Sequence, residues 1–382
     1  MDARWLDPIL ARPDDDEPRL VYADALMERG DPRGELIRVQ CALARHDASD
    51  GDVGDVGRLR SRERALLKAH HATWTATLPR TILTSFLFRR GFLEELVGSG
   101  DAFATITPAR AEQAPLLRAL SVGSGGRVGG LFANPDAAIL ESLSIHAPSD
   151  ETIAALAASP HLPRLRRFAM EKAFLDGASV GALVSLPQPL EELHLGFDGR
   201  ISSAGNFVKQ LTTCPARATL RRLTVTQLRH LSPLGDAAAA LASLEQLTLE
   251  NADLERAAMM KLAANLPRLQ SLDVSENYSS YDLEALDAAA LLAALPSLRW
   301  LRLNKLGLGD RQAIALAESP DASRLTRLDL GRNRIGDAGA LALARSPHLA
   351  RLRRLNLNAN ALSDGAKRAI REAFPRATIQ LR

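Results

Sequence analysis

The segment LTRLDLGRNRIGDAGALALARSPHLAR, residues 325–351, is followed at once by LRRLNLNANALSDGAKRAIREAFPR, residues 352–376. Both segments open on the pattern LxxLxL and carry an asparagine at its ninth position. Self-similarity at a fixed period is typical of a repeat array, in which each unit packs only against its neighbours. The two copies therefore predict an array rather than one compact domain.

The pattern occurs ten times along the chain, with other apolar residues at some of the leucine positions. Successive copies are 23 to 30 residues apart, a spacing typical of leucine-rich repeats. The copies begin at Leu117, Leu140, Leu165, Leu190, Leu220, Leu244, Leu269, Leu298, Leu325 and Leu352.

Each repeat is predicted to form a short strand followed by a helix. In LTRLDLGRN, Leu328 and Leu330 alternate with polar residues, which is the period of a strand with one buried face. In IGDAGALALARSP the period changes to three or four residues, as on an amphipathic helix that buries Ile335, Ala338, Leu341 and Ala342.

The ends of this helix are also predicted, because Asp337 can cap its start and Pro347 marks its end. Stacked repeats place the strands in a parallel sheet on a concave side and the helices on a convex side. Asparagines at the ninth position are expected to bond the open backbone between neighbouring turns: Asn277, Asn333 and Asn360.

These repeats resemble the ribonuclease-inhibitor type of leucine-rich repeat, with LGDRQAIALAESP (308–320) and residues 335–347 as its helical half. The resemblance covers residues 117 to 381 and implies an α/β solenoid shaped like a horseshoe. Spacings of 23 to 25 in the first half are shorter than the usual spacing of about 27 to 29. The convex elements there are expected to be shorter.

An N-terminal resemblance precedes the array. PDDDEPRLVYADALMERGDPRGELIRVQCAL, residues 13–43, resembles a helical companion domain found before such repeats in many bacterial proteins. FRRGFLEEL, residues 88–96, resembles the family's join to the first repeat. We therefore expect a helical companion and capping domain over 1–78, a connecting segment over 79–116, and about ten repeats with a C-terminal cap over 117–382. The resemblance implies a bacterial protein and no known activity. The stretch MDARWLDPIL, residues 1–10, lacks the basic start and apolar run of a signal peptide, so we expect a cytoplasmic protein.

The N-terminal domain is predicted to be helical. Asp31 is an N-cap before Pro32, a second helix runs from Arg58 to about Trp74, and the loop over 47–57 is predicted to be exposed and mobile. The acidic run Asp14 to Glu17 favours a helix cap over a metal site, since it lacks the alternating ligand spacing of a calcium loop.

Composition limits the function classes. Among 382 residues only two are cysteines, Cys41 and Cys214, and both are expected to be buried apolar residues rather than parts of a disulfide framework. No phosphate loop, HExxH motif or nucleophile elbow occurs, and the glycine-rich GSGGRVGG (123–130) is expected to be a turn. We expect no enzyme activity, cofactor, metal or membrane span, and the sequence does not specify an oligomeric state.

Charge is uneven along the chain. The net charge is +3, but residues 298–382 hold 17 Lys/Arg and 7 Asp/Glu, a net +10. Strand alternation exposes Trp300 on the concave face, with Arg302, Arg327 and Arg354 expected in line around it and Asp329 as the only acid among them. Trp and Arg are enriched in interface hot spots.

The candidate partner-binding residues lie on the predicted concave face. They are Trp300, Arg302, Asn304, Arg327, Asp329, Arg332, Arg354, Asn356, Asp273 and Glu250. The alternative for Trp300 is a purely structural packing on the Arg302 or Arg327 stem by cation-π contact. Tyr278 and Tyr281 are candidates to extend the patch along one rim.

The leading hypothesis is an adaptor, scaffold or inhibitor that binds a protein partner through this face. Two alternatives stay open. The basic C-terminal half favours nucleic acid, although stacking aromatics are scarce and a nucleic-acid partner is not expected. The other is a recruitment subunit or enzyme with chemistry on Tyr22, Asp24 and Arg29, yet RLVYADALMERG (19–30) is predicted to be one helix burying Leu20, Leu26 and Met27.

Overall fold

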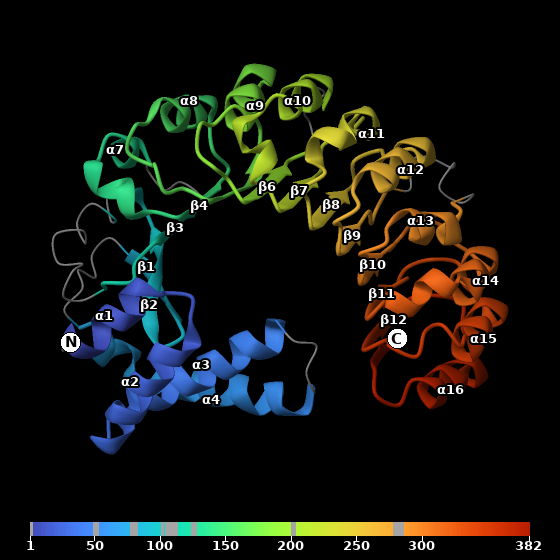
Figure 1. Cartoon of the computed structure of the whole chain (residues 1–382), viewed down its shortest axis with the longest axis horizontal. Coiled ribbons are helices and arrows are strands. Elements are labelled where there is room, and N and C mark those ends of the chain that lie inside the picture. Colours follow the sequence, from blue (N-terminus) through green and yellow to red (C-terminus); the bar gives the residue numbers. More distant parts are fainter. Residues whose placement is uncertain are drawn as a thin grey trace. The chain divides into compact units, whose positions relative to one another are not determined.

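The computed structural model describes residues 3–48, 53–76, 83–100, 103, 114–123, 128–199, 204–277 and 286–382 (Figure 1). The chain divides into two compact units. The first unit comprises Met1–Ile145 and Ser159–Leu165, and the second unit comprises His146–Ala158 and Arg166–Arg382.

The first unit begins with the helices α1 (Ala3–Ala11), α2 (Asp16–Glu28), α3 (Pro32–Ala48) and α4 (Val53–Trp74). The carboxylate of Asp15 caps α2 by accepting from the Glu17 N–H, and Asp31 caps α3 by accepting from the Arg33 N–H at 2.8 Å, so both predicted caps are confirmed. α4 begins five residues earlier than predicted, so residues 53–57 are helical rather than loop. The glycine-rich run over 123–130 and the loop over 47–57 lie partly outside the described residues.

The core of the first unit packs these helices against the hairpin that follows them. Its buried residues are Ile9, Tyr22, Ala23, Leu26, Ile37, Cys41, Phe92 and Leu116. Leu26 is buried as predicted and Leu20 is half-buried, but Met27 is 44% exposed, so its predicted burial is wrong. The helix turns Met27 away because Tyr22, Ala23 and Leu26 form the buried side of α2.

The predicted join over 88–96 is an antiparallel hairpin of β1 (Leu83–Arg89) and β2 (Phe92–Gly98). Its turn places Arg90 and Gly91 at φ values of 47° and 81°, the left-handed region. A Cβ on Gly91 would lie 2.0 Å from Cγ1 of Ile37, so only glycine fits there. The strands β3 (Ala119–Val122) and β4 (Ser142–His146) continue the sheet in parallel, with α7 (Gly129–Phe132) and a 3-10 helix at Pro135–Ile139 between them.

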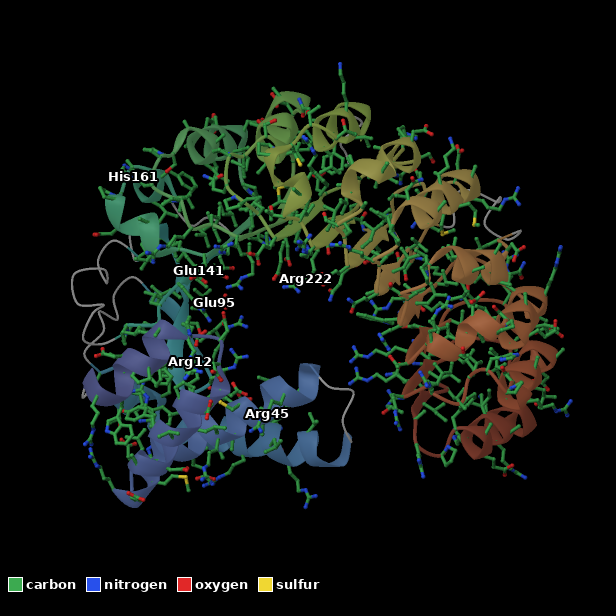
Figure 2. The ribbon with its side chains drawn as sticks, viewed as in Figure 1. Arg12, Arg45, Glu95, Glu141, His161 and Arg222 are labelled. Atoms are coloured by element: carbon green, nitrogen blue, oxygen red, sulfur yellow. The ribbon has the colours of Figure 1, made fainter. Side chains whose placement is uncertain are left out.

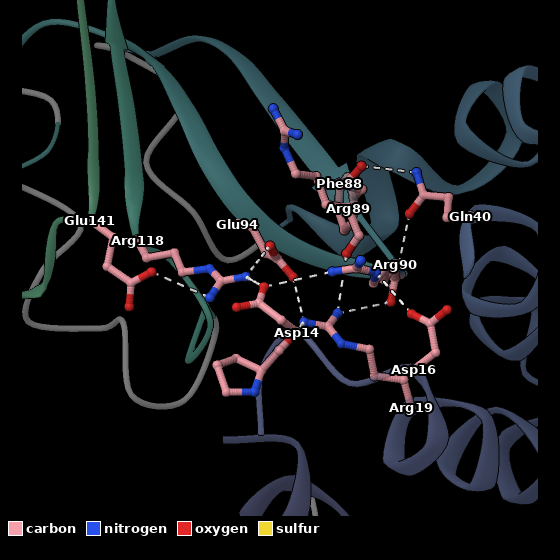
Figure 3. Close-up of polar contacts among 12 residues, drawn as sticks. Asp14, Asp16, Arg19, Gln40, Phe88, Arg89, Arg90, Glu94, Arg118 and Glu141 are labelled. Carbon is pink, nitrogen blue, oxygen red and sulfur yellow. Dashed lines mark hydrogen bonds and ion pairs between the residues drawn. The ribbon is translucent and has the colours of Figure 1, made fainter. Parts of the chain in front are cut away.

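A buried ion network ties α2 to the hairpin (Figure 3). Arg19 is fully buried, and its Nη2 lies 2.6 Å from Oε1 of the equally buried Glu94 on β2. Arg118 bridges the other Glu94 oxygen at 3.3 Å and Asp14 at 2.7 Å. Within the acidic run Asp14 to Glu17, Asp15 therefore forms the predicted helix cap, and Asp14 forms ion pairs.

The second unit is an array of parallel strands in chain order. They are β5 (Arg167–Ala173), β6 (Glu192–Phe197), β7 (Arg222–Thr226), β8 (Gln246–Glu250), β9 (Ser271–Asp273), β10 (Trp300–Arg302), β11 (Arg327–Asp329), β12 (Arg354–Asn356) and β13 (Thr378–Gln380). Each strand from β3 to β12 begins two residues after a predicted repeat start, so the repeat register is confirmed. The strand β13 follows the last copy of the pattern.

Helices follow the strands of this unit. They are α8 (Asp150–Ala158), α9 (Gly177–Val184), α10 (Ala204–Leu211), α11 (Leu234–Ala237), α12 (Arg256–Asn265), α13 (Ala288–Ala294), α14 (Asp310–Glu318), α15 (Asp337–Arg345) and α16 (Asp364–Ala373), with 3-10 helices at Pro215–Ala218, Ala238–Leu241 and Pro320–Arg324. Figure 1 shows the strands of the second unit on the inner side of its curve and the helices on the outer side. We call the strand side away from the helices the concave face.

Two details of the helices differ from the predictions. Among the repeats of 23 to 25 residues, marked shortening occurs at α7 and α11, which span four residues each, while α12 spans ten. The buried face of α15 is formed by Gly339, Ala340 and Leu343, and Ala338 is exposed. The first turn of α15 therefore buries other residues than the spacing of three to four residues predicted.

In the last repeats, Asp310 and Asp337 bond to the start of the next repeat's helix rather than to their own. Asp337 lies in the first turn of α15 and accepts from the backbone N–H and the hydroxyl of Ser363, just before α16. The start of α15 is instead held by Asp310, whose Oδ1 accepts from the Gly336 N–H at 2.7 Å and the Gly339 N–H at 2.9 Å. The predicted self-capping by Asp337 is wrong, because stacking brings the preceding acid closer to these donors.

The asparagine prediction is confirmed. Oδ1 of Asn333 accepts from the N–H groups of Leu306 and Leu308, and its Nδ2 donates to the carbonyls of Leu303 and Leu330. Asn277 and Asn360 bond the backbone of their own turns and of the preceding repeat in the same way. The amides therefore join neighbouring repeats.

A left-handed residue lies five positions after the first residue of most strands, and all but one of these are neither glycine nor asparagine. Lys305, Arg332 and Ala359 have φ values of 54°, 53° and 54°. The conformation turns the chain from the strand toward the convex side, at a steric cost for any residue with a Cβ. The others are Ala147, Lys172, Gln227, Asn251 and Glu276.

Candidate functional site on the concave face

Parallel register sorts the concave side chains of the last strands into rows. Trp300 pairs with Ser271 on one side and Arg327 on the other, and Arg354 follows Arg327. Arg302 belongs to the next row, between Asp273 and Asp329. The sequence predicted that Arg302, Arg327 and Arg354 lie in one row. This prediction is wrong, because Arg302 is two residues further along its strand.

Trp300 is covered by cations from two rows. The guanidinium carbon of Arg302 lies 4.9 Å from the centre of the Trp300 ring, and that of Arg327 lies 5.5 Å from it. Both distances are within the range of cation-π contact. The ring is half-buried, so the predicted contact exists and still leaves part of the indole accessible.

A hollow of about 210 Å³ lies beside this tryptophan. We call it the Trp300 hollow. Its rim holds three arginines and one carboxylate, and its floor is formed by buried leucines of β11 and β12. The lining residues are Trp300, Arg302, Arg327, Leu328, Asp329, Arg354, Leu355, Asn356, Thr378 and Gln380.

A second hollow of about 270 Å³ lies further along the strands, toward their carboxyl ends. We call it the Glu250 hollow. Its side chains include three carboxylates, and it shares Arg302 and Asn356 with the Trp300 hollow. The lining residues are Glu250, Asp273, Ser275, Glu276, Arg302, Asn304, Gly331, Arg332, Asn356 and Asn358.

Arg302 forms the wall between the two hollows. Its Nη1 lies 3.0 Å from Oδ2 of Asp273, and its Nε lies 3.4 Å from Oδ2 of Asp329. Asp273 therefore joins Asp329 as a second acid at this arginine, which corrects the expectation of a single one. Two carboxylates and one ring hold the guanidinium in place, so Arg302 is a fixed part of the site.

The sequence predicted that Asp273 is exposed on the concave face, but its side chain is buried. It is 6% exposed, and its Oδ1 accepts from the N–H of Ser275 at 3.0 Å and from its hydroxyl at 2.6 Å. Ser275, which also lines the Glu250 hollow, is 5% exposed. Asp273 supports Arg302 from below.

The side chains of Asn304 and Asn356 both accept hydrogen bonds from backbone N–H groups beside the hollows. Oδ1 of Asn304 accepts from the Gly331 N–H at 3.0 Å, and Oδ1 of Asn356 accepts from the Asn358 N–H at 2.9 Å. A Cβ on Gly331 would lie 2.9 Å from Nδ2 of Asn356, so the glycine makes room for this amide. These side chains build the floor between the hollows.

The two hollows differ in electrostatic character. Burial raises the pKa of the Glu250 carboxyl, and the neighbouring carboxylates of Asp273 and Glu276 raise it further against the charges of Arg302 and Lys305. In the Trp300 hollow, Arg354 is exposed, and the described residues provide no ion-pair partner for its guanidinium. One hollow therefore favours an anionic group and the other a cationic one.

All ten predicted site residues line one of the two hollows, and five further lining side chains were missed. Arg332 is 70% exposed and lies 4.0 Å from Glu276. The missed polar side chains lie at the turns after the strands or on β13, where no leucine pattern assigns a face: Ser275, Glu276, Asn358, Thr378 and Gln380. Lys305 pairs with Glu276. Tyr278 and Tyr281 lie outside the described residues. Figure 2 shows Arg222 on β7, a strand of the concave face that precedes the strands of the two hollows.

The remaining candidates are placed elsewhere. Tyr22 is buried in the core of the first unit, and Asp24 is exposed and paired with Arg38. Cys41 and Cys214 are buried as predicted, and burial raises the pKa of the Cys41 thiol to about 12. Within the described ranges, no group of three His, Cys, Asp or Glu side chains is arranged to hold a metal ion, and no helix has the length and apolarity of a membrane span.

Comparison with known proteins concerns the fold of the chain. Residues 323–344 match the family model for the Leucine Rich repeat, and no curated protein matches the chain. A chain in the crystal structure of the Rad7 and Elc1 complex in yeast has a TM-score of 0.50 at 16% identity, over 92% of this chain and 82% of that chain. An internalin, InlF, from Listeria monocytogenes has a TM-score of 0.42 at 18% identity, over 82% of this chain and 90% of that chain.

The matched repeat covers one strand-turn-helix unit of the array, and the chain of the Rad7 and Elc1 complex is similar to this chain in fold. The predicted fold class is confirmed. The chain is an α/β leucine-rich-repeat solenoid with an α-helical N-terminal region.

Proposed function

We propose that this protein is a non-enzymatic interaction module, an adaptor, scaffold or inhibitor, that binds a protein partner through the concave face of its second unit. The observation that carries the proposal is the position of Trp300. A half-buried indole lies between two guanidiniums at the mouth of a preformed hollow. Solenoid folds use extended concave surfaces for binding, and the chain of similar fold noted above comes from a complex of Rad7 and Elc1.

The two hollows set the chemistry of the partner. An Asp or Glu side chain seated in the Trp300 hollow would meet Arg327 and Arg354, and a Lys or Arg in the Glu250 hollow would meet Glu250 and Glu276. In strand register Arg327 aligns with Gln246 of β8, so Glu250 lies four residues further along and three strands away. At about 3.3 Å per residue and about 4.8 Å per strand, the two anchor points are on the order of 20 Å apart. The partner surface therefore carries an acid and a base at that separation.

Preorganisation favours this use of the site. Arg302 is held by Asp273 and Asp329, so the wall between the hollows does not have to become ordered on binding. The same contacts make nucleic acid the weaker candidate, because the central arginine is already neutralised and Glu250, Glu276 and Asp329 would repel phosphates.

Affinity capture from the host lysate tests the proposal. The bait is the wild-type protein, the variant Trp300→Ala/Arg354→Glu, or the control Arg368→Glu, which changes an exposed arginine on α16. We expect a protein that the wild type and the control retain and the concave variant loses, with at least about tenfold less recovered. Equal recovery by all three baits would place binding elsewhere, and recovery of nucleic acid alone would favour the other partner class.

A further inference from the structure

An open groove of about 710 Å³ lies in the first unit, between α3, α4 and the hairpin. We call it the α3–α4 groove. It shares no lining residue with the two hollows of the concave face, and every residue that lines it belongs to the first unit. The lining residues are Gln40, Leu43, Ala44, Arg60, Glu63, Arg64, Phe88, Arg89 and Arg90.

The groove is preformed because Gln40 joins its three walls. Its Nε2 donates to Oε1 of Glu63 on α4 at 2.7 Å and to the Phe88 carbonyl on β1 at 2.9 Å. Its Oε1 accepts from the Gly91 N–H at 2.7 Å. Figure 3 shows Gln40 reaching the hairpin from α3. A ligand therefore meets walls that are already fixed.

The floor and the rim differ in character. Leu43 and Phe88 are buried, and Ala44 lies beside them, so the floor is apolar. Phe88 is supported from behind by the rings of His71 and Trp74 at centroid distances of 5.8 Å. A leucine-sized side chain on this floor would remove apolar surface from water on both partners.

The rim is basic. Four arginines and one glutamate line the groove, and that glutamate already accepts a bond from Gln40. Arg89 pairs with Glu95 and Arg90 with Asp16. Among the described residues, Arg64 bonds to its own helix alone, at the Arg60 carbonyl and the Ser61 hydroxyl. Arg60, Arg64 and Arg89 are exposed, so their guanidiniums are accessible to an anionic ligand.

From this floor and rim we infer that the α3–α4 groove binds an acidic peptide segment of a protein, with an apolar side chain on Leu43, Ala44 and Phe88 and carboxylates beside Arg60, Arg64 and Arg89. A nucleic acid fits less well, because Phe88 is 8% exposed and offers no open face for stacking, and Glu63 lies within the groove. This inference does not depend on binding at the concave face.

The test measures fluorescence anisotropy of a labelled peptide in which leucine is flanked by glutamates, Glu-Glu-Leu-Glu-Glu, with the full-length protein. We expect saturable binding, weakened at least about tenfold when the glutamates become glutamines and again when the leucine becomes glycine. The variants Arg60→Glu/Arg64→Glu and Ala44→Asp should each weaken binding by about tenfold or more, the first by charge and the second by placing an acid on the floor.

The matched control is Arg58→Glu/Lys68→Glu, which makes the same charge change on exposed positions of α4 outside the groove. Circular dichroism confirms that each variant is folded. Absence of saturable binding by the wild type, or equal weakening by the control, overturns the inference, and so does tighter binding of single-stranded DNA than of peptide at the same salt. The variant Trp300→Ala/Arg354→Glu should bind the peptide as the wild type does, which separates this site from the concave one.

Discussion

Arg302 contacts Trp300 and Asp273 at the same time: its guanidinium carbon lies 4.9 Å from the ring centre, and its Nη1 lies 3.0 Å from Oδ2 of the acid. The acid is 6% exposed, so the arginine balances a buried charge while it covers one side of the indole. One side chain therefore supports both the stability of β9 to β11 and the shape of the candidate site.

The first prediction concerns this pair. Arg302→Ala leaves the Asp273 carboxylate buried with only the Ser275 bonds, and we expect it to lower the free energy of unfolding by about 1 to 3 kcal/mol. Arg354→Ala, on an exposed side chain, should change it by less than about 0.5 kcal/mol. Urea unfolding of the two variants compares the values, and equal losses would contradict the role given to Arg302.

The second prediction concerns the repeat core. Leu301 and Leu328 occupy equivalent positions of neighbouring strands and are 0% and 1% exposed. Truncating either to alanine should cost about 2 to 5 kcal/mol, because a cavity remains in a packed core. Val21→Ala, at a 53% exposed position, is the control. Thermal unfolding curves of Leu301→Ala or Leu328→Ala that match the wild type would refute the register.

The third prediction concerns the asparagine bonds between repeats. Asn333→Ala leaves the N–H groups of Leu306 and Leu308 and two carbonyls without this amide in a buried turn. We expect a loss of about 1 to 3 kcal/mol in the free energy of unfolding, larger than for the less buried Asn360→Ala. Denaturant titration measures both, and the reverse order would argue against the burial difference as the cause.

The fourth prediction concerns the left-handed turn residues. Ala359 is exposed at φ 54°, a conformation that a Cβ disfavours. Ala359→Gly should raise the free energy of unfolding by up to about 1 kcal/mol, since glycine relieves that strain. Ala369→Gly, inside α16, should lower it by about 1 kcal/mol. Calorimetry measures the stability of both variants. A loss of stability in both would show that the turn conformation at Ala359 has no effect.

The fifth prediction concerns pH. The pKa of Glu250 is raised by burial and by two neighbouring acids, so the folded chain binds the proton more tightly than the unfolded chain. Ionisation of Glu250 therefore destabilises the fold above the folded-state pKa, and the effect disappears once both states are protonated at low pH. Glu250→Gln should be more stable than the wild type at about pH 7 and equal to it below about pH 4. The melting temperatures of Glu250→Gln and of the wild type are compared across that pH range. A difference that does not change with pH would show that ionisation of Glu250 is not its cause.

Much of the second unit was predictable because strand alternation alone decides which leucines are buried. The pattern at Leu325 or Leu352 specifies the face of every residue up to Leu330 and Leu357, and stacking then fixes the neighbours of each strand. The asparagine role followed from the same register. These features depend on local sequence repeated at a fixed period.

The contacts that shape the site depend on pairing across strands, which one repeat does not encode. The partners of Arg302 lie 27 and 29 residues away, and its offset from Arg327 is visible only once the strands are in register. The left-handed turns carry lysine, arginine and alanine rather than glycine, so no residue type marks them. The α3–α4 groove needs two helices and a hairpin together, and sequence periodicity gives no such placement.

Site-specific photocrosslinking tests the central claim most directly. A photoreactive amino acid is placed at Asn358, which lines the Glu250 hollow, or at Arg368 on the convex helix α16, and each protein is irradiated in host lysate. We expect a protein adduct from the concave position alone, and its loss when Trp300→Ala/Arg354→Glu is added. An adduct from Arg368 with none from Asn358 would contradict binding through the concave face.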